Sequence, residues 1–319
     1  MTEIIYLSQI KKILKTINPL KLIEEGFVAY SQGKVVVPPV GEMIFEDPPG
    51  DCHIKYGFIK RGDYYVVKIA QGFYKNPQKG LPSTSGLNIL FSQKTGEVLC
   101  VLLDEGHLTN VRTAAAGAIV AKYMAPQKIR RIGIMGYGIQ GKMQLEYLKD
   151  VVTCRDAIVW GRREIGLVKY KQDMTDSGFN IETTLDSEEI TNTCNLIVTC
   201  TPSKVPLIKA EQVRKGTHIT AMGSDTPEKQ ELDTEILRIA NRVIVDSISQ
   251  AASRGECFRA MEEGKITKDD MVELGTMISS KKLQRQTDNE ITVADLTGVA
   301  IQDIQISKAV YEGIKTKNI

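Results

Sequence analysis

Short apolar runs alternate with helix-like segments through the middle of the chain, between residues 131 and 246. The runs are RIGIM (131–135), DAIVW (156–160), NIETT (180–184), NLIVTC (195–200), THITAM (217–222) and RVIVD (242–246). Strands that alternate with helices predict a parallel sheet with helices on both faces. Most of these runs are rich in Ile and Val, as strands buried on both faces must be. We therefore predict an α/β fold with a Rossmann-type doubly wound parallel sheet, from about residue 115 to about residue 300.

Glycines at the end of the first run raise the question of a nucleotide site. The segment RIGIMGYGIQGKMQLEYL places Gly136, Gly138 and Gly141 between a strand-like run and a helix-like one. In dinucleotide-binding folds the first glycine makes the turn, the second lets the backbone approach a pyrophosphate, and the third packs helix on strand. The free N–H groups at the helix start would then bind the phosphates. The bare pattern also occurs in ordinary strand-to-helix turns, and only its position ahead of a doubly wound sheet favours the nucleotide.

The residues before this region follow a different pattern. SQIKKILKTI and LKLIEEGFVAY predict two amphipathic helices, and the prolines in PPV and EDPPGD break any continuation. After them HIKYGFI, YYVVKIA, LNILF and EVLCVLL, joined by short turns, predict an antiparallel meander. A chain of 319 residues has room for a second domain of this kind. We predict an α+β module onto which the final helix, IQISKAVYEGIKTK, could fold back.

Arg112 lies near the start of an Ala-rich segment between the two modules. The stretch LDEGHLTNVRTAAAGAIVAKYMAP predicts a closely packed helix that is ended by Pro126. A cation at the N-terminal end of a helix is unfavourable beside the helix dipole. A bound anion or carboxylate would explain this placement, and a solvated arginine is the alternative.

Composition argues against several classes of protein. The net charge is +2 with 25% charged residues, so there is no electrostatic case for binding nucleic acid or an anionic membrane. No apolar run is long enough to span a bilayer and the N-terminus lacks the apolar core of a signal peptide, so we expect a cytoplasmic protein. The six cysteines lack CxxC or His-rich ligand spacing, which predicts buried free thiols and no metal site.

Seven motifs occur in an order that resembles the ornithine cyclodeaminase and mu-crystallin family, over nearly the whole chain. They are VKIAQGF, GLPSTSGLNILF, LTNVRTAAAGAIVAKY, GIMGYGIQGKMQ, AMGSDTPEKQELD, VDSISQAASRGE and TGVAIQDI. The resemblance implies a substrate-binding and dimerisation domain of residues 1–114, completed by 300–319, and a dinucleotide-binding domain of residues 115–299. Family members act at a Cα–N bond as cyclodeaminases, amino-acid dehydrogenases or ketimine reductases, and some bind ligands without known catalysis.

The resemblance also implies which residues bind and transform the substrate. By motif, the cations that bind the substrate carboxylate are Lys68 and Arg112. Arg can bind a carboxylate through two parallel hydrogen bonds, while Lys supplies a point charge and can also donate a proton. Ser83 stands where the family often has Thr, and Thr84 beside it could substitute. Asp225, just after the predicted strand THITAM, is the expected proton-transfer residue together with Lys68.

One segment departs from the family. Family enzymes often carry another arginine in the N-terminal module, where this chain reads VVVPPVGEMIFEDPPGDCHIKYGF, residues 35–58. No arginine is available in that segment, and His53 or Lys55 could take over the anion contact. The identity of the substrate therefore stays open, and strict ornithine cyclodeaminase activity is put in doubt.

The end of the second apolar run indicates which nicotinamide cofactor is bound. An NAD site places an acid there, about 20 residues after the glycines, to bind the ribose hydroxyls. In IVWGRREIG this place falls on Gly161, followed by Arg162 and Arg163, so we predict NADP(H) rather than NAD(H). The alternatives are that both arginines are surface residues and that Glu164 bonds the ribose. The residues expected to bind the cofactor are Thr113, Gly136, Gly138, Ile139, Gln140, Gly161, Arg162, Arg163, Thr199, Thr201, Met222, Gly223 and Thr297.

These residues predict an NAD(P)(H)-dependent oxidoreductase that interconverts an amino acid, or cyclic amino acid, and its imine, as a ketimine reductase or amino-acid dehydrogenase. Lys68 and Arg112 would orient the carboxylate, and Asp225 would shuttle protons. Because cells keep the NADP pool reduced, we expect imine reduction. The alternatives are a redox-neutral ornithine cyclodeaminase, forming proline and ammonia, and an NADPH-dependent ligand-binding protein without turnover. The expected partners are a small amino acid or imine and a second copy in a homodimer, with no nucleic acid or membrane.

Overall fold

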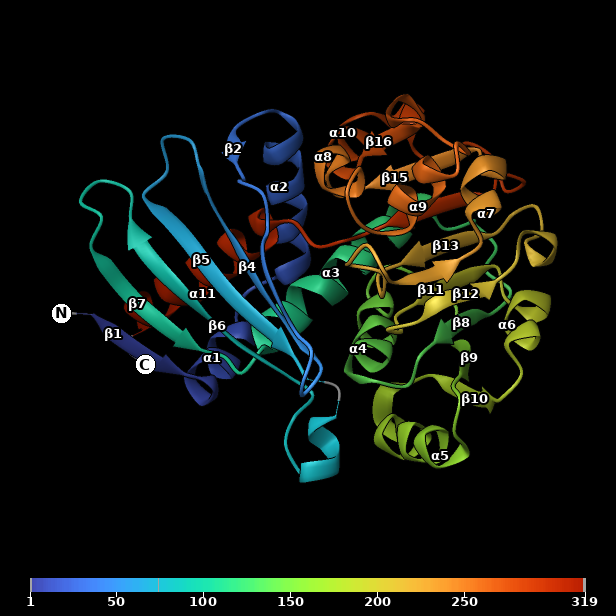
Figure 1. Cartoon of the computed structure of the whole chain (residues 1–319), viewed down its shortest axis with the longest axis horizontal. Helices are drawn as coiled ribbons and strands as arrows, with labels where there is room; N and C mark the ends of the chain where they lie inside the picture. The colour runs from blue at the N-terminus through green and yellow to red at the C-terminus, as the bar shows by residue number, and fades with distance from the viewer. Residues whose placement is uncertain (1, 74, 318–319) are drawn as a thin grey trace. The chain divides into compact units, whose positions relative to one another are not determined.

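The chain forms two compact units in the computed structural model, which describes residues 2–73 and 75–317 (Figure 1). The first unit comprises Met1–Thr113 and Val299–Ile319, and the second unit comprises Ala114–Gly298. These boundaries lie beside those expected from the sequence at 114 and 300. The roles assigned to the two units, substrate binding and dinucleotide binding, stay predictions.

The second unit is built on an eight-stranded sheet whose neighbouring strands are all parallel. Its strand order is β10-β9-β8-β11-β13-β17-β15-β16. The strands are β8 (Ile132–Met135), β9 (Asp156–Trp160), β10 (Asn180–Thr184), β11 (Leu196–Thr199), β13 (His218–Ala221), β15 (Arg242–Val245), β16 (Met271–Glu273) and β17 (Thr292–Asp295). The predicted doubly wound sheet is confirmed, and each of the predicted runs forms one of its strands.

Two strands of this sheet, β16 and β17, were not predicted from the sequence. β16 is three residues long, too short to show any periodicity. β17 lies between β13 and β15, and polar Thr292 and Asp295 stand at its two ends although both are buried. The Thr292 hydroxyl lies 2.8 Å from Nδ1 of His218, and Asp295 accepts a hydrogen bond from the backbone N–H of Cys257. Because the Thr292 hydroxyl and one oxygen of Asp295 find partners inside the protein, polar residues are tolerated in this strand and it lacks an apolar signature.

Helices cover both faces of the sheet (Figure 1). Ile132 and Ile134 of β8 pack in one apolar cluster, with Leu145 of the following helix, whereas Met135 and Ile190 belong to a second cluster. Neighbouring residues of one strand therefore face different cores, as a sheet buried on both sides requires. The helices of this unit are α4 (Ile139–Leu148), α5 (Glu164–Asp173), α6 (Ser187–Thr193), α7 (Thr234–Ile239), α8 (Ile248–Ala251), α9 (Glu256–Glu262) and α10 (Leu274–Ser279). Two short parallel strands, β12 (Lys204–Ile208) and β14 (Gln230–Leu232), form a separate pair.

The first unit contains one sheet of order β1-β7-β6-β5-β4-β2, with β3 also paired to β4. The strands are β1 (Glu3–Tyr6), β2 (Val35–Val36), β3 (Gly41–Phe45), β4 (Gly50–Ile59), β5 (Tyr64–Gly72), β6 (Thr84–Ser92) and β7 (Val98–Leu103). The helices are α1 (Leu7–Leu14), α2 (Pro19–Ser31) and α11 (Ala300–Lys317), and α3 (His107–Met124) begins in this unit. β4 to β7 form the predicted antiparallel meander, and β1 adds to β7 in parallel.

The two faces of the first unit's sheet differ in what they carry. Directly paired residues project to the same face, so the register places Lys55, Lys68 and Asn88 in one row across β4, β5 and β6. This face packs against α11, which Figure 1 shows behind the strands. The predicted return of the final helix onto this module is therefore confirmed. The row puts two lysines and an amide inside the unit, where polar groups need partners.

In the part of the chain that the structure describes, no helix is long and apolar enough to cross a membrane. The six cysteines are free thiols, of which Cys154 and Cys200 are only partly buried. Within residues 2–73 and 75–317 no group of three or more His, Cys, Asp or Glu side chains is arranged to hold a metal ion.

Candidate functional site

The glycine turn after β8 has the local geometry of a dinucleotide loop. Gly136 has φ of 122°, a conformation that L side chains rarely adopt. A Cβ on Gly141 would lie 2.0 Å from the carbonyl oxygen of Gly136, so the helix can approach the turn only with glycine there. A Cβ on Gly138, which caps the start of α4, would meet nothing within 4 Å. Backbone N–H groups at the α4 start are thus open to a ligand.

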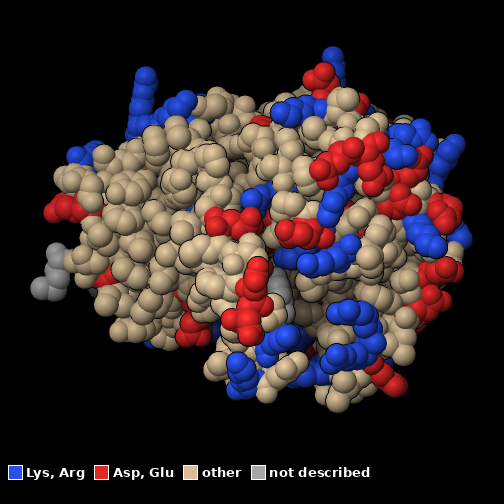
Figure 2. All heavy atoms as spheres, viewed as in Figure 1, with Lys and Arg blue, Asp and Glu red and all other residues tan. Residues whose placement is uncertain are grey.

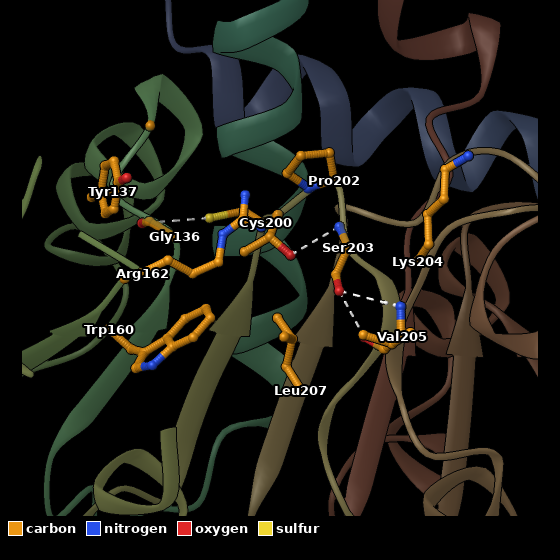
Figure 3. A pocket seen from close by; sticks show the side chains of 13 residues that line it. Gly136, Tyr137, Trp160, Arg162, Cys200, Pro202, Ser203, Lys204, Val205 and Leu207 are labelled. Carbon is orange, nitrogen blue, oxygen red and sulfur yellow. Dashed lines mark hydrogen bonds between the residues drawn. The ribbon is translucent and has the colours of Figure 1, made fainter. Parts of the chain in front are cut away.

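A cavity of about 530 Å³ opens beside this turn (Figure 3). Its size falls within the range of about 300–1,000 Å³ that small-molecule sites occupy. The lining residues are Gly136, Tyr137, Gly138, Trp160, Gly161, Arg162, Cys200, Thr201, Pro202, Ser203, Lys204, Val205 and Leu207. Five of the residues predicted to bind the cofactor are in this lining: Gly136, Gly138, Gly161, Arg162 and Thr201.

The other residues predicted to bind the cofactor lie outside this lining. They are Ile139 and Gln140 in the first turn of α4, Arg163 before α5, Thr199 at the end of β11, Met222 and Gly223 after β13, Thr297 after β17, and Thr113 in the first unit. The hydroxyl of Thr297 donates to Asp246 at 3.2 Å, and that of Thr199 is also engaged inside the protein. Their contact with a cofactor stays a prediction.

Glu231 on β14 lies buried beneath the cavity, and the sequence analysis did not single it out. Its Oε1 accepts hydrogen bonds from the backbone N–H and the hydroxyl of Thr201, at 2.7 and 2.8 Å. Its Oε2 accepts from the hydroxyl of Thr199 at 2.8 Å and from the backbone N–H of Gly223 at 2.9 Å. Burial raises the pKa of Glu231 to about 7, although these hydrogen bonds oppose the shift.

More carboxylates lie behind Glu231. Glu256 accepts hydrogen bonds from the backbone N–H groups of Glu231, at 2.7 Å, and Leu232, at 3.1 Å. Burial, reinforced by neighbouring carboxylates, raises the pKa of Glu256 well above its usual range. Asp295 accepts from the backbone N–H of Cys257 at 2.8 Å, and burial raises the pKa of Asp295 to about 7. These carboxylates lie at or near the carboxyl end of the sheet, where ligands of doubly wound folds bind.

Asp225 follows β13, at the carboxyl edge of the sheet as predicted. Its Oδ1 lies 2.6 Å from Nζ of Lys229, four residues later in sequence, and Arg254 donates to its backbone carbonyl at 3.2 Å. The Asp225 side chain is 39% exposed, whereas that of Lys229 is buried. Asp225 therefore combines a cationic partner with access from outside, which a proton-transfer group needs.

The first unit brings the two predicted carboxylate-binding cations together. Nε of Arg112 lies 3.1 Å from Oδ1 of Asp303 on α11, and Nζ of Lys68 lies 3.6 Å from its Oδ2. Nη1 of Arg112 donates to Oε1 of Gln302 at 3.0 Å. Lys68, Arg112 and Asp303 are each exposed by 5% or less. The position of Arg112 near a helix start suggested a carboxylate partner. The carboxylate beside it is that of Asp303, a residue of the same chain.

Lys55 and Asp104 extend this cluster. Lys55 is buried directly opposite Lys68 on the neighbouring strand. Asp104 accepts hydrogen bonds from Nδ2 of Asn88, at 3.3 Å, and from the backbone N–H of Leu108 at the start of α3, at 2.8 Å. Burial raises the pKa of Asp104 to about 6. The cluster thus joins Lys68 and Arg112 at Asp303, with Lys55 opposite Lys68 and Asp104 beside Asn88.

His53, the other residue considered for the anion contact, has different surroundings. Its Nδ1 lies 3.3 Å from Oε1 of Glu42 and its Nε2 lies 3.6 Å from Oδ1 of Asp51. A ring between two carboxylates is poorly placed to bind another carboxylate. Lys55 lies opposite Lys68, whereas His53 does not, and an anion contact by either residue stays a prediction.

Comparison with known proteins places the chain in a family. Residues 2–318 match the ornithine cyclodeaminase/mu-crystallin family. The chain belongs to this family. An alanine dehydrogenase of Archaeoglobus fulgidus is 37% identical over 319 residues, covering 100% of this chain and 97% of that protein.

Solved structures agree with this family membership. An archaeal alanine dehydrogenase dimer with bound NAD superimposes with a TM-score of 0.89 at 36% identity, covering 100% of this chain and 97% of that one. The Δ1-pyrroline-2-carboxylate reductase of Thermococcus litoralis, solved with NADH and L-proline, gives a TM-score of 0.92 at 26% identity, covering 100% and 99%.

Ser83 and Thr84, the remaining residues predicted from the family resemblance, lie at the start of β6. They line a second cavity, of about 360 Å³, together with Gln71, Phe73 and Asn76 among others. The backbone carbonyl of Ser83 accepts a hydrogen bond from the N–H of Phe73 at 2.8 Å. Ser83 is partly buried and Thr84 is exposed, and their contact with a substrate stays a prediction.

Sequence reasoning missed Asp303, Glu231 and Asp104, although signals for them were present. Asp303 and Glu231 lie inside two of the motifs shared with the family, TGVAIQDI and AMGSDTPEKQELD. Each is an acidic residue next to apolar ones that are buried, which marks a carboxylate that must find internal partners. Asp104 lies three residues before the Ala-rich helix, and its side chain accepts from the backbone N–H of Leu108 in the first turn.

Proposed function

We propose that this protein is a nicotinamide-dependent oxidoreductase that interconverts an amino acid, or a cyclic amino acid, and its imine, with imine reduction as the working direction. The observation that carries the proposal is the buried cluster in which Lys68 and Arg112 contact Asp303 and Lys55 lies opposite Lys68. Three cations beside two carboxyl groups, Asp303 and Asp104, favour binding of one further carboxylate, the group common to amino acids and their imines. Family membership and the names of the relatives, a dehydrogenase of an amino acid and a reductase of a cyclic imine, support the same reaction class.

Arg112 and Lys68 bind and orient the substrate in this proposal. Asp303 and Gln302 hold Nε and Nη1 of Arg112, so the guanidinium plane is fixed and its Nη2 side binds the substrate carboxylate. Lys68, held by the other oxygen of Asp303, adds a second positive charge. Fixing the carboxylate at two cations restrains the Cα–N bond and replaces a random encounter with an oriented one.

Asp225 and Lys68 handle the protons. In imine reduction the nitrogen must be protonated as the carbon accepts hydride, and the exposed carboxylate of Asp225 passes it a proton that comes from the ammonium of Lys229. Lys229, 2.6 Å from Asp225, returns or takes up a proton between turnovers. Lys68 relays a proton near the substrate in the same way, since an ammonium can donate hydrogen bonds and protons.

The cavity of the second unit suits a nicotinamide dinucleotide. No side chain covers the backbone at the α4 start, where Gly138 faces open space, and the cavity beside it has the volume of a ligand site. When bound, the cofactor supplies hydride to the imine carbon or accepts it from the amine carbon. Arg162 in the cavity lining, with Gly161 in place of an acid, supports a preference for NADP(H) over NAD(H). The solved relatives carry NAD or NADH, so this preference is the finer part of the proposal.

A homodimer formed through the first unit is part of the same proposal. The outer face of its sheet carries an apolar row of Tyr56, Val67, Ile89, Val101 and Ile4. Figure 2 shows few charged side chains over β4 to β7. An apolar sheet face of this extent normally packs against another surface, and the archaeal alanine dehydrogenase was solved as a dimer. Light scattering at micromolar concentration should give the mass of two chains, and the mass of one chain would contradict this assembly.

Nicotinamide absorbance tests the reaction. The protein is incubated with a panel of cyclic and linear imines of amino acids and NADPH or NADH, and separately with amino acids and NADP or NAD. We expect oxidation of the reduced cofactor with at least one imine. Ornithine converted to proline and ammonia without net change in cofactor would favour the cyclodeaminase alternative. Tight cofactor binding with no turnover of any compound would favour a binding protein.

Asp225→Asn tests the proton-transfer role. The amide keeps the shape of the carboxyl group but cannot donate or accept the proton, so turnover should fall by roughly 100-fold or more while cofactor affinity is unchanged. Activity within a few-fold of the unmodified protein would remove Asp225 from the mechanism.

A further inference from the structure

Glu231 joins the ends of two neighbouring strands of the second unit. Thr199 and Thr201, at and just beyond the end of β11, donate to the two oxygens of its carboxyl group, and Gly223, beyond β13, donates to one of them. The β11 end continues into the cavity lining at Thr201. The β13 end continues, two residues later, into Asp225. One buried side chain thus contacts the wall of the cavity and the backbone that carries the predicted proton-transfer residue.

The two strand ends lie close enough that only glycine fits at position 223. A Cβ on Gly223 would lie 2.1 Å from the carbonyl oxygen of Thr201 and 2.6 Å from Oε2 of Glu231. Glu231 is itself held in place, because Glu256 accepts from its backbone N–H at 2.7 Å. Its strand β14 also pairs with β12, so that Gln230 lies opposite Lys204 of the cavity lining.

The hydrogen-bond pattern requires two accepting oxygens at residue 231. The backbone N–H of Thr201 donates to Oε1, and the backbone N–H of Gly223 donates to Oε2. A backbone N–H can only donate, so both oxygens of residue 231 must accept. An amide offers one accepting oxygen, and in either orientation its NH₂ would face one of the two backbone N–H groups. Glutamine therefore keeps the size of the side chain but loses one of the two strand-end contacts.

We propose that Glu231 is a positioning residue, whose carboxylate holds the Thr201 wall of the cavity against the Gly223 end of β13 and thereby sets cofactor affinity. The inference rests on the proposed function, in which this cavity binds a nicotinamide dinucleotide. Glu231 does not line the cavity, and it acts through Thr201 and Gly223. When one of these contacts is lost, the cavity wall at Thr201 is less ordered before the cofactor binds. Binding must then order this wall, and the lost conformational entropy lowers the affinity for the cofactor.

Trp160 provides a readout that does not depend on activity. It is the single tryptophan of the chain and lines the cavity, so its fluorescence reports binding of NADPH or NADH directly. In Glu231→Gln the midpoint of the titration should move to roughly tenfold higher cofactor concentration, as loss of one hydrogen bond to a charged group implies. A variant that is merely less well folded would lower the amplitude of the titration without moving its midpoint.

Glu290→Gln is the matched control. Glu290 is a largely buried carboxylate that accepts a hydrogen bond from the backbone N–H of Gln286 and contacts Arg242, at the opposite, amino edge of the sheet. This variant should leave the titration midpoint unchanged.

Thr199→Val covers the case in which Glu231→Gln does not fold. It removes a single hydroxyl donor to Oε2 of Glu231 and keeps the shape of the side chain, and it should raise the midpoint by about threefold. An unmodified protein that binds neither NADPH nor NADH would overturn the proposed function. If the unmodified protein binds the cofactor and the titration midpoint of Glu231→Gln lies within twofold of its midpoint, only the role of Glu231 is overturned. The same criterion applies to Thr199→Val if Glu231→Gln does not fold.

Discussion

The two units bury charged side chains in opposite ways. In the first unit Lys68 and Arg112 lie beside the carboxylate of Asp303, so charges of both signs face one another. In the second unit the buried carboxylates Glu231 and Glu256 accept hydrogen bonds from backbone N–H groups. The first arrangement depends on side-chain ions, and the second depends on backbone donors at strand ends.

This difference suits the two roles that we propose. A cluster of ions can exchange or add a charged partner, since a further carboxylate finds cations already desolvated and oriented. Carboxylates held by backbone N–H groups have no such freedom, because their hydrogen-bond capacity is used to hold loops together. Burial raises the pKa of Asp104 in the first unit and of Glu231 and Asp295 in the second, and the shift is larger in the second.

Removing the shared carboxylate of the first unit should have the largest effect. Asp303→Ala leaves Lys68 and Arg112 buried without their partner, and the free energy of unfolding should fall by about 3–5 kcal/mol. Urea unfolding measures it. Asp303→Asn keeps the shape of the side chain and one acceptor for Arg112, so the free energy of unfolding should fall less than in Asp303→Ala. A loss below about 1 kcal/mol in the alanine variant would mean that the cluster does not depend on this ion pair.

The acidic cluster of the second unit should show itself in the pH dependence of stability. The pKa of Asp295 is about 7 in the folded protein against an ordinary value of 3.8, so the folded state holds its proton more tightly than the unfolded state. Its contribution to stability is therefore greatest at low pH, falls as the pH rises from about 4 to about 7, and is constant above that. Asp295→Asn removes this contribution, on the order of 2–4 kcal/mol.

Urea unfolding at about pH 5 and about pH 8 measures the difference between the unmodified protein and Asp295→Asn. The comparison with Asp295→Asn is needed because Glu231 also makes the folded protein less stable as the pH rises. His218 acts in the opposite direction, since burial lowers the pKa of its ring to about 3. The same pH dependence in both proteins would show that Asp295 does not titrate in this range.

Arg112→Lys tests whether the first unit recognises an external carboxylate. Lysine keeps the charge but loses the planar fork, so KM for the substrate should rise roughly 10- to 100-fold while cofactor affinity is unchanged. Steady-state kinetics measure KM for the substrate, and Trp160 fluorescence measures the affinity for the cofactor. Arg61→Lys, at an exposed position of the same unit, is the matched control. If neither kcat nor KM moves, Arg112 is not the carboxylate anchor.

The smallest effect concerns the arginines after β9. Arg162→Ala should weaken NADPH binding by about fivefold and leave NADH binding nearly unchanged, because it removes a charge near the 2′-phosphate. Arg163→Ala should weaken NADPH binding less, since Arg163 lies outside the cavity lining. Equal or tighter binding of NADH by the unmodified protein would reject both the NADP(H) preference and the expected direction of reaction.

Local pattern was sufficient to predict much of the fold. Ile and Val runs of strand length between amphipathic segments predicted β8, β9, β10, β11, β13 and β15, because burial on both faces leaves an apolar run in the sequence. β17 escaped prediction although it lies in the middle of the sheet. Its Thr292 and Asp295 are buried through bonds to residues distant in sequence, such as His218, and no local pattern records such bonds.

The candidate site likewise contains residues that the sequence predicted and partners that it did not predict. Lys68, Arg112 and Asp225 followed from motifs, and Gly136, Gly138 and Arg162 from their positions after predicted strands. The partners of these residues did not follow. Arg112 and Asp303 are 191 residues apart in the chain, and only the packing of α11 against the first unit's sheet brings them together.

The sequence by itself determined six strands of the second unit's sheet, the antiparallel meander, the glycine turn and the chemical groups available for catalysis, since these depend on composition and spacing within short segments. Only the tertiary structure decided that Asp303 lies between Lys68 and Arg112, that Lys55 rather than His53 stands beside them, and that Glu231 joins two strand ends. The reason is physical. A buried charge is stable only where hydrogen bonds or opposite charges compensate its desolvation, and those partners come from whichever segments the fold brings into contact.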